Sequence, residues 1–116
     1  MRYLLLIYGD EGRETTPEEQ GKIFQAYGAF TQDLQERGLM RAGEALEGVS
    51  TARTLRVRNG ERIVSDGPFA ETKEQLGGFY AIECDSLDEA IETAARIPTA
   101  EHGSIEIRPI MEVPNG

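Results

Sequence analysis

RYLLLIY, residues Arg2 to Tyr8, is apolar on both of its alternating faces. One face carries Tyr3, Leu5 and Ile7, and the other carries Leu4, Leu6 and Tyr8. Strands with this pattern are covered on both sides, whereas a strand with one face in water alternates apolar and polar residues. We therefore predict a central strand at the start of the chain.

A long amphipathic helix is predicted next. The polar stretch Gly9–Thr15 leads to Thr16, which is placed to cap a helix, with Pro17 at its first position and Glu19 closing a capping box. Gly38 supplies the left-handed residue that ends the helix. Apolar residues recur between these ends at helical spacing on one face, namely Ile23, Phe24, Tyr27, Phe30 and Leu34.

The middle of the chain predicts a short strand and a hairpin. Leu39–Leu46 is short and interrupted by glycine, and we expect a strand there. Thr54–Ser65 contains two alternating runs joined by Asn59-Gly60, the pair that a type I′ turn requires. This turn places Arg58 opposite Glu61 and Leu55 opposite Val64, so that one face gathers Leu55, Val57 and Val64.

The last third of the chain predicts a strand, a helix and a strand. We expect a loop at Asp66–Gly78 and a strand at Phe79–Cys84. Ser86 and Glu89 form a second capping box, and Pro98 ends the helix whose apolar face carries Leu87, Ala90, Ile91 and Ala94. Ser104–Ile110 alternates as a strand, and its Pro109 predicts an edge position or an interface.

This order of elements predicts an α+β fold. Two strand–helix–strand units flank an inserted β-hairpin, which corresponds to a ferredoxin-like βαββαβ subunit. A chain of 116 residues corresponds to a single domain, residues 1–116. Such a sheet has helices on one face only, and the apolar second face of Arg2–Tyr8 then needs a cover. A second copy of the chain is the simplest cover, so we expect a homodimer.

Composition excludes several classes of function. The net charge of −9 opposes binding to nucleic acid or to an anionic membrane surface. No apolar run is long enough to span a bilayer, and we expect a cytoplasmic protein. The single cysteine, Cys84, and the single histidine, His102, exclude an ordinary zinc site within one chain. We expect no cofactor and no tightly held transition metal.

One segment of the chain resembles a known family. Asp66–Glu74 reads DGPFAETKE and continues QLGGFYAIE, which is similar to the signature of the DGPF family, a branch of the YCII-related proteins. The resemblance extends from RYLLLIYGDE through AARIP to GSIEIRPI. It implies a dimeric α+β barrel of ferredoxin-like subunits and, for many bacterial members, a genetic association with extracytoplasmic-function sigma factors.

The resemblance also implies a departure from some relatives. Some YCII-type proteins carry a histidine on the first helix and an aspartate near the end of the second, proposed to act as an acid/base pair. This chain has Tyr27 on its first helix, and its second ends in Arg96-Ile97-Pro98.

The DGPF segment supplies the first candidate site residues. Asp66-Gly67-Pro68 is either a simple turn or a rigid turn that aims the Asp66 carboxylate into a cleft as a base, with Phe69 as an apolar floor. Glu71 and Lys73 are either solvated charges or ligand contacts, with Lys73 suited to an anionic ligand. A third possibility is a carboxylate cage for a divalent cation, formed by Asp66, Glu71, Glu74 and Glu44.

Further candidates lie elsewhere in the chain. Tyr27 is on the apolar helix face and is either a core residue or a catalytic hydrogen-bond donor. Glu44 lies between small residues, which leave room for a ligand, or is an outward-facing charge. His102 precedes a strand and is either exposed or a ligand contact, and Cys84 is expected in the core.

Two functions from different classes fit these residues. The first is a dimeric protein that binds a small, partly apolar or anionic molecule, with possible turnover by proton transfer of the isomerase or decarboxylase type, in which Asp66 is the base and Lys73 or Tyr27 orients the ligand. The second is a non-catalytic regulatory partner of a sigma factor. The sequence by itself does not choose between an enzyme and a binding protein.

Overall fold

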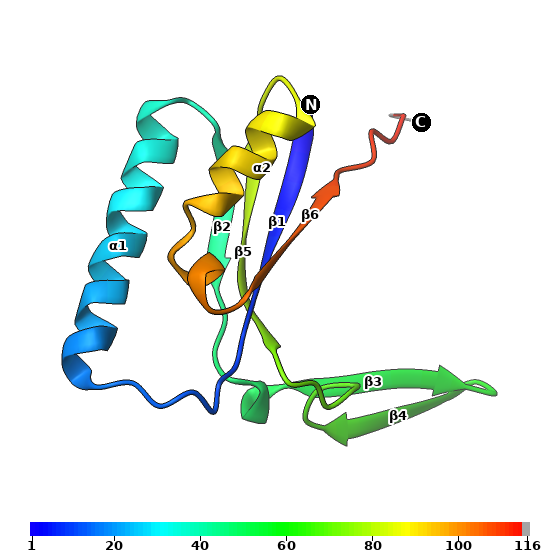
Figure 1. Cartoon of the computed structure of the whole chain (residues 1–116). Helices are drawn as coiled ribbons and strands as arrows, with labels where there is room; N and C mark the ends of the chain where they lie inside the picture. The colour runs from blue at the N-terminus through cyan, green and yellow to red at the C-terminus, as the bar shows by residue number, and fades with distance from the viewer. Residues whose placement is uncertain (115–116) are drawn as a thin grey trace.

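The computed structural model describes residues 1–114 of the chain. It contains six strands and two α-helices (Figure 1). In chain order they are β1 (Arg2–Gly9), α1 (Pro17–Glu36), β2 (Met40–Ala45), β3 (Arg53–Arg58), β4 (Glu61–Asp66), β5 (Gln75–Glu83), α2 (Leu87–Ala95) and β6 (Ser104–Pro109). Two short 3-10 turns, η1 (Val49–Thr51) and η2 (Pro98–Glu101), complete the set. No helix within these residues is long and apolar enough to cross a membrane.

Four strands form one antiparallel sheet in the order β2-β5-β1-β6. This order, with α1 and α2 as crossovers, is that of a ferredoxin-like subunit, which confirms the predicted fold class. The prediction of a central β1 is confirmed, because β5 and β6 flank it. The edge position that Pro109 predicted is confirmed as well, since β6 is an outer strand.

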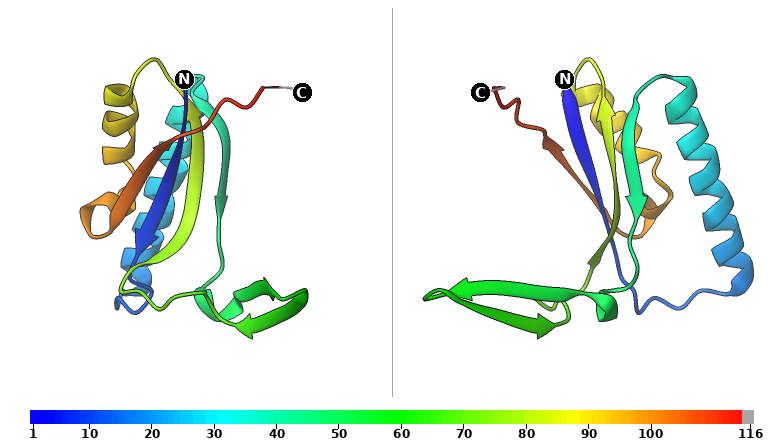
Figure 2. Two further views of the ribbon diagram at one scale, coloured as in Figure 1. Left: turned by 90° about the vertical axis from the view of Figure 1, so that its right-hand side faces the viewer. Right: turned by 180° about the vertical axis from the view of Figure 1, so that it is seen from behind.

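The sheet has one covered face and one open face. Tyr3, Leu5 and Ile7 of β1 point to the helix side and are buried. They form the core with residues of both helices, of β5 and the position directly after it, and of the segment before η2, namely Phe30, Leu34, Tyr80, Ile82, Cys84, Ala90, Ala94 and Ile97. Leu4, Leu6 and Tyr8 face the other way and are half-buried in the single chain. Figure 2 shows both helices on one side of the sheet.

Thr16 caps the start of α1 and Gly38 ends the helix, as predicted. The Thr16 hydroxyl accepts a hydrogen bond from the Glu19 backbone N–H at 3.1 Å. At the other end Gly38 has φ of 71°, and the Leu39 N–H donates to the Leu34 carbonyl at 3.0 Å. These bonds satisfy backbone groups that a helix end otherwise exposes to water, so α1 stops where the glycine occurs.

The predicted hairpin forms with the predicted register. Arg58 pairs with Glu61 and Leu55 with Val64, and the turn residues Asn59 and Gly60 have φ of 51° and 77°. β3 and β4 form a separate two-stranded sheet that projects from one end of the main sheet, away from α1 (Figures 1 and 2).

Two predicted details are wrong. The loop expected at Asp66–Gly78 ends earlier, because β5 already begins at Gln75 and accommodates its two glycines beside an irregularity in the pairing with Ile7 and Tyr8. On α2 the buried residues are Ala90, Thr93 and Ala94, whereas Leu87 and Ile91 remain about half exposed. Small side chains let α2 approach the sheet closely, which turns the larger ones outward.

Candidate functional site

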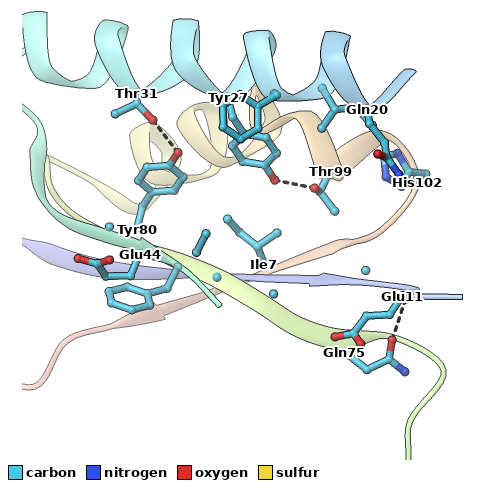
Figure 3. Close-up of a pocket in the computed structure, with 18 of the residues that line it drawn as sticks. Ile7, Glu11, Gln20, Tyr27, Thr31, Glu44, Gln75, Tyr80, Thr99 and His102 are labelled. Carbon is cyan, nitrogen blue, oxygen red and sulfur yellow. Dashed lines mark hydrogen bonds between the residues drawn. The ribbon is translucent and has the colours of Figure 1, made fainter. Parts of the chain in front are cut away.

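A pocket lies between α1 and the sheet. Its volume is about 600 Å³, within the range of small-molecule sites. Residues of α1 form one wall, and β1, β2 and β5 form the floor (Figure 3). The loop after β1 and the turn η2 border the pocket at the end where α1 begins.

Small residues line part of the pocket floor. Gly43, Ala45 and Gly78 occupy neighbouring positions on the helix-facing side of β2 and β5, where Gly43 pairs with Tyr80 and Ala45 with Gly78. The backbones are also close: a Cβ atom at Gly78 would lie 2.8 Å from the Glu44 carbonyl oxygen. Glycines inside a strand often mark a close backbone approach or a ligand site. Part of the pocket floor is therefore backbone, and larger side chains such as Ile7 and Met40 form the rest.

Two tyrosine–threonine pairs form the polar part of the walls. The Tyr27 hydroxyl on α1 and the Thr99 hydroxyl on η2 share a hydrogen bond of 2.5 Å. The Tyr80 hydroxyl on β5 and the Thr31 hydroxyl on α1 share one of 2.7 Å. Each pair connects α1 to the rest of the molecule across the pocket (Figure 3). The walls are thus apolar surfaces with a few fixed hydroxyl groups.

Tyr27 keeps its proton at neutral pH. Burial raises the pKa of Tyr27 above its ordinary value, because a phenolate loses its hydration between α1 and η2, and the hydrogen bond with Thr99 opposes this only in part. A protonated phenol donates or accepts a hydrogen bond but does not act as a base. The arrangement suits the donor role considered for Tyr27.

The mouth of the pocket carries charged and polar groups. Asp10 accepts a hydrogen bond from the Gly12 N–H at 2.8 Å, and the Glu11 carboxylate accepts from the Val49 N–H at 3.1 Å. These carboxylates shape the loop after β1. Arg13, Gln20 and His102 also line the pocket, and Figure 3 labels Gln20 and His102 at the end where α1 begins.

Three of the predicted site residues border this pocket. Tyr27 and His102 line it from α1 and from the end of η2. Glu44 borders it as well, but it pairs with Phe79 on β5 and alternates with Gly43, so its side chain belongs to the open face. Tyr27 and His102 are therefore the predicted residues whose side chains the fold brings to one cavity.

The DGPF segment lies outside the pocket of its own chain. The Asp66 side chain is 91% exposed and forms an ion pair with Arg53 at 3.1 Å across the hairpin base. Phe69 is 79% exposed, and Glu71 and Lys73 are exposed too. The expectation that a rigid turn holds Asp66 in a cleft with Phe69 as the floor is not met within one chain. The loop leaves the sheet at its end, beyond the cavity.

The carboxylate cage is not formed either. Within residues 1–114 no three His, Cys, Asp or Glu side chains lie close enough together to hold a metal ion. Asp66 faces Arg53, and Glu74 accepts a hydrogen bond from the Ser104 hydroxyl at 2.7 Å. The carboxylates considered together in the sequence thus have separate partners.

Sequence reasoning missed most of the pocket. Gly43, Gly78, Thr31 and Thr99 were not candidates, because none carries a reactive group by itself. One signal was present: Gly77-Gly78 precedes an apolar run, and glycines in such a run indicate a bulge or a close approach rather than a loop.

Comparisons with known proteins identify relatives of the whole chain. A family model described as YCII-related domain matches residues 1–114. An uncharacterised protein of Rhizobium meliloti (strain 1021) is 42% identical over 114 residues, which cover 95% of this chain and 92% of that protein. Among solved structures, the 5-chloro-2-hydroxyhydroquinone dehydrochlorinase TftG of Burkholderia phenoliruptrix AC1100, in complex with 2,5-dihydroxybenzoquinone, superposes with a TM-score of 0.55 at 14% identity. That likeness covers 97% of this chain and 96% of the neighbour, and it concerns the fold.

Proposed function

The chain belongs to the YCII-related domain family, and from this membership and the pocket we propose a homodimeric α+β barrel protein that binds a small molecule under α1. The observation that carries the proposal is the pocket of about 600 Å³ between α1 and the sheet, whose floor includes glycine and alanine. A core selected for stability alone fills such a space with side chains, because each void reduces packing energy.

The lining defines the class of ligand. Apolar side chains of Ile7, Ile23 and Phe24 form a surface for a ring or a short hydrocarbon. The hydroxyl groups of Tyr27 and Thr99 and the guanidinium group of Arg13 suit oxygen substituents of such a ring. We propose a compact, partly apolar ligand with hydroxyl, carbonyl or carboxylate oxygens.

We also propose that the protein catalyses proton transfer on the bound ligand. An imidazole has one ring nitrogen that accepts a proton and one that donates a proton, so we propose His102 as the acid/base group at the pocket mouth. Tyr27, held protonated beside Thr99, would orient the ligand. Asp66, the base expected from the DGPF turn, could serve only a site that includes more than its own pocket.

The open face of the sheet supports the homodimer. Leu4, Leu6 and Tyr8 of β1 lie there beside Phe79 and Ala81 of β5, which pair with Leu6 and Leu4. This apolar strip runs through the middle of a sheet whose other face the helices cover. A second sheet packed on it would bury the strip and form the barrel that the family resemblance implies.

Isothermal titration with 2,5-dihydroxybenzoquinone tests the pocket. This probe is the molecule bound by the TftG structure, and it combines a small ring with oxygen substituents. Ala45→Phe places a ring on the pocket floor and should weaken binding by at least about tenfold. Ala26→Phe adds the same ring at an exposed position of α1 that does not line the pocket, and it should leave binding unchanged. Equal binding by the two variants would contradict the assignment of the site.

Two further proposals concern the branch of the family and a protein partner. Assignment to the DGPF branch rests on DGPFAETKE at Asp66–Glu74. A sigma-factor partner rests on the family resemblance, and a pull-down with the purified chain would test it.

A further inference from the structure

The β3–β4 hairpin lacks support from its own chain. β3 and β4 pair with each other and, within residues 1–114, with no strand of the main sheet. Hydrogen bonds secure the base, where the Gly67 N–H donates to the Ala52 carbonyl at 2.8 Å and the Thr54 hydroxyl to the Gly67 carbonyl at 2.9 Å. The radius of gyration is 16.4 Å, whereas a compact chain of this length has about 13 Å. The projecting hairpin accounts for an outline this extended (Figure 1).

One face of the hairpin is mostly apolar and open to solvent, with Arg62 opposite Val57 as its charged residue near the tip. Leu55, Val57 and Val64 share this face and are 59%, 55% and 63% exposed. An isolated two-stranded hairpin is marginally stable in water, and independent stability needs further strands or a packed apolar face. A hairpin with this face therefore requires a surface to pack on.

The hairpin also differs in charge from the rest of the molecule. Residues 53–66 hold four of the 12 basic residues and two of the 21 acidic ones, a net charge of +2. The remaining residues hold eight basic and 19 acidic residues, a net charge of −11. A basic arm on an acidic body is complementary to the body of another copy of the same chain.

The direction and the length of the β3–β4 hairpin indicate which part of a second copy it contacts. It leaves the end of the sheet on the side opposite α1, the side of the open face (Figure 2). Six residues in each strand extend about 20 Å, while two stacked sheets lie about 10 Å apart. An arm of this length passes beyond a sheet stacked on the open face and reaches the helix layer of the second copy.

We infer that the β3–β4 hairpin is an intersubunit arm, which packs its apolar face on a second copy and brings its tip to the mouth of that copy's pocket. This inference rests on the proposed homodimer. The tip and its flanks carry Arg56, Arg58 and Arg62, and the pocket mouth carries two carboxylates, Asp10 and Glu11, beside one cation, Arg13. Each pocket is then bordered by residues of two chains, and the arm adds cationic groups that favour a ligand with negative charge.

Two adjacent substitutions test the packing of the arm. Val64→Asp places a carboxylate on the apolar face, and Ile63→Asp places the same group on the other face of the same strand. Sedimentation over a dilution series should show that Val64→Asp raises the dimer dissociation constant by at least about tenfold and Ile63→Asp by much less. A dimer equally affected by both would overturn the arm and leave the dimer standing. A monomeric wild type would overturn the dimer itself.

Cross-linking tests the reach of the tip. In a Cys84→Ala background, Asn59→Cys at the turn is combined with Gln20→Cys at the pocket mouth, or with Glu92→Cys on the exposed side of α2. A short bismaleimide should form covalent dimers at least about tenfold faster with the first pair, because the two thiols are then close in the assembly. Equal rates in a protein that sediments as a dimer would show that the tip does not reach the pocket.

Discussion

At Gly77 and Gly78 the same substitution meets different surroundings. A Cβ atom at Gly78 would lie 2.8 Å from the Glu44 carbonyl oxygen, whereas at Gly77 the nearest atom is 4.0 Å away. Backbone cannot move aside as a side chain does, so Gly78→Ala must displace β2 from β5. We expect Gly78→Ala to reduce the free energy of unfolding by about 1–3 kcal/mol. Gly77→Ala should change it by less than about 0.5 kcal/mol. Urea denaturation of both variants measures this difference, and equal effects would contradict the close approach.

Tyr27 links stability to alkaline pH. Burial raises the pKa of Tyr27, so the folded protein holds this proton more tightly than the unfolded chain does. Its contribution is complete below the ordinary value of 10.0 and decreases as the pH rises above it. Tyr27→Phe should cost about 1 kcal/mol at neutral pH, through the lost hydrogen bond to Thr99. Denaturation curves from about pH 9 to about pH 11 should show the wild type losing part of this advantage. A constant difference would contradict the assignment.

Cys84 should be unreactive in the folded protein. It is buried, as expected for a core residue, and its thiol donates to the Ser86 carbonyl at 3.3 Å. Burial raises the pKa of the Cys84 thiol, and the thiolate is the reactive species. We expect labelling by iodoacetamide at least about 100-fold slower than in urea. Fast labelling under native conditions would show that the end of β5 opens readily.

At the scale of elements, α1 has two unequal halves. Its second half is anchored by buried Phe30 and Leu34, whereas its first ten residues are exposed except for the half-buried Ile23. The first half therefore covers the pocket with little support from below. Hydrogen exchange should be at least about tenfold faster for amides at 21–26 than at 27–36. Uniform protection would contradict this difference, and a bound probe should reduce it by filling the pocket.

At the scale of the whole molecule, two neighbouring leucines of β1 lie on opposite faces of the sheet and stabilise different structures, the fold and the proposed dimer. Leu5 is fully buried against the helices, and Leu6 lies on the open face. Leu5→Asp buries a charge in the core and should prevent folding. Leu6→Asp should leave the fold intact and produce a monomer, because the charge lies where a second sheet would pack. Circular dichroism and light scattering distinguish the two results. A dimeric Leu6→Asp variant would contradict the proposed interface.

The sequence by itself determined the elements and their order. Local features were sufficient to predict the elements, because each feature depends on residues a few positions apart. They are the caps at Thr16 and Gly38, the Asn59-Gly60 turn and the alternation in β1 and β6. The apolar residues on both faces of β1 also indicated a central strand and an open face of the sheet. The start of β5 was misjudged for the same reason: its glycines resemble a loop until a neighbouring strand is present to pair with them.

Only the tertiary structure decided where the pocket lies and which side chains line it. Tyr27 meets Thr99, 72 positions later in the chain, and Tyr80 meets Thr31 across 49 positions. No local sequence pattern predicts these contacts, because they result from the packing of α1 against the sheet. The same packing left Asp66 at the exposed base of a projecting hairpin, although the DGPF turn supplied the first candidate site residue. Local chemistry sets backbone conformation, whereas a cavity depends on distances between elements, which only the assembled fold determines.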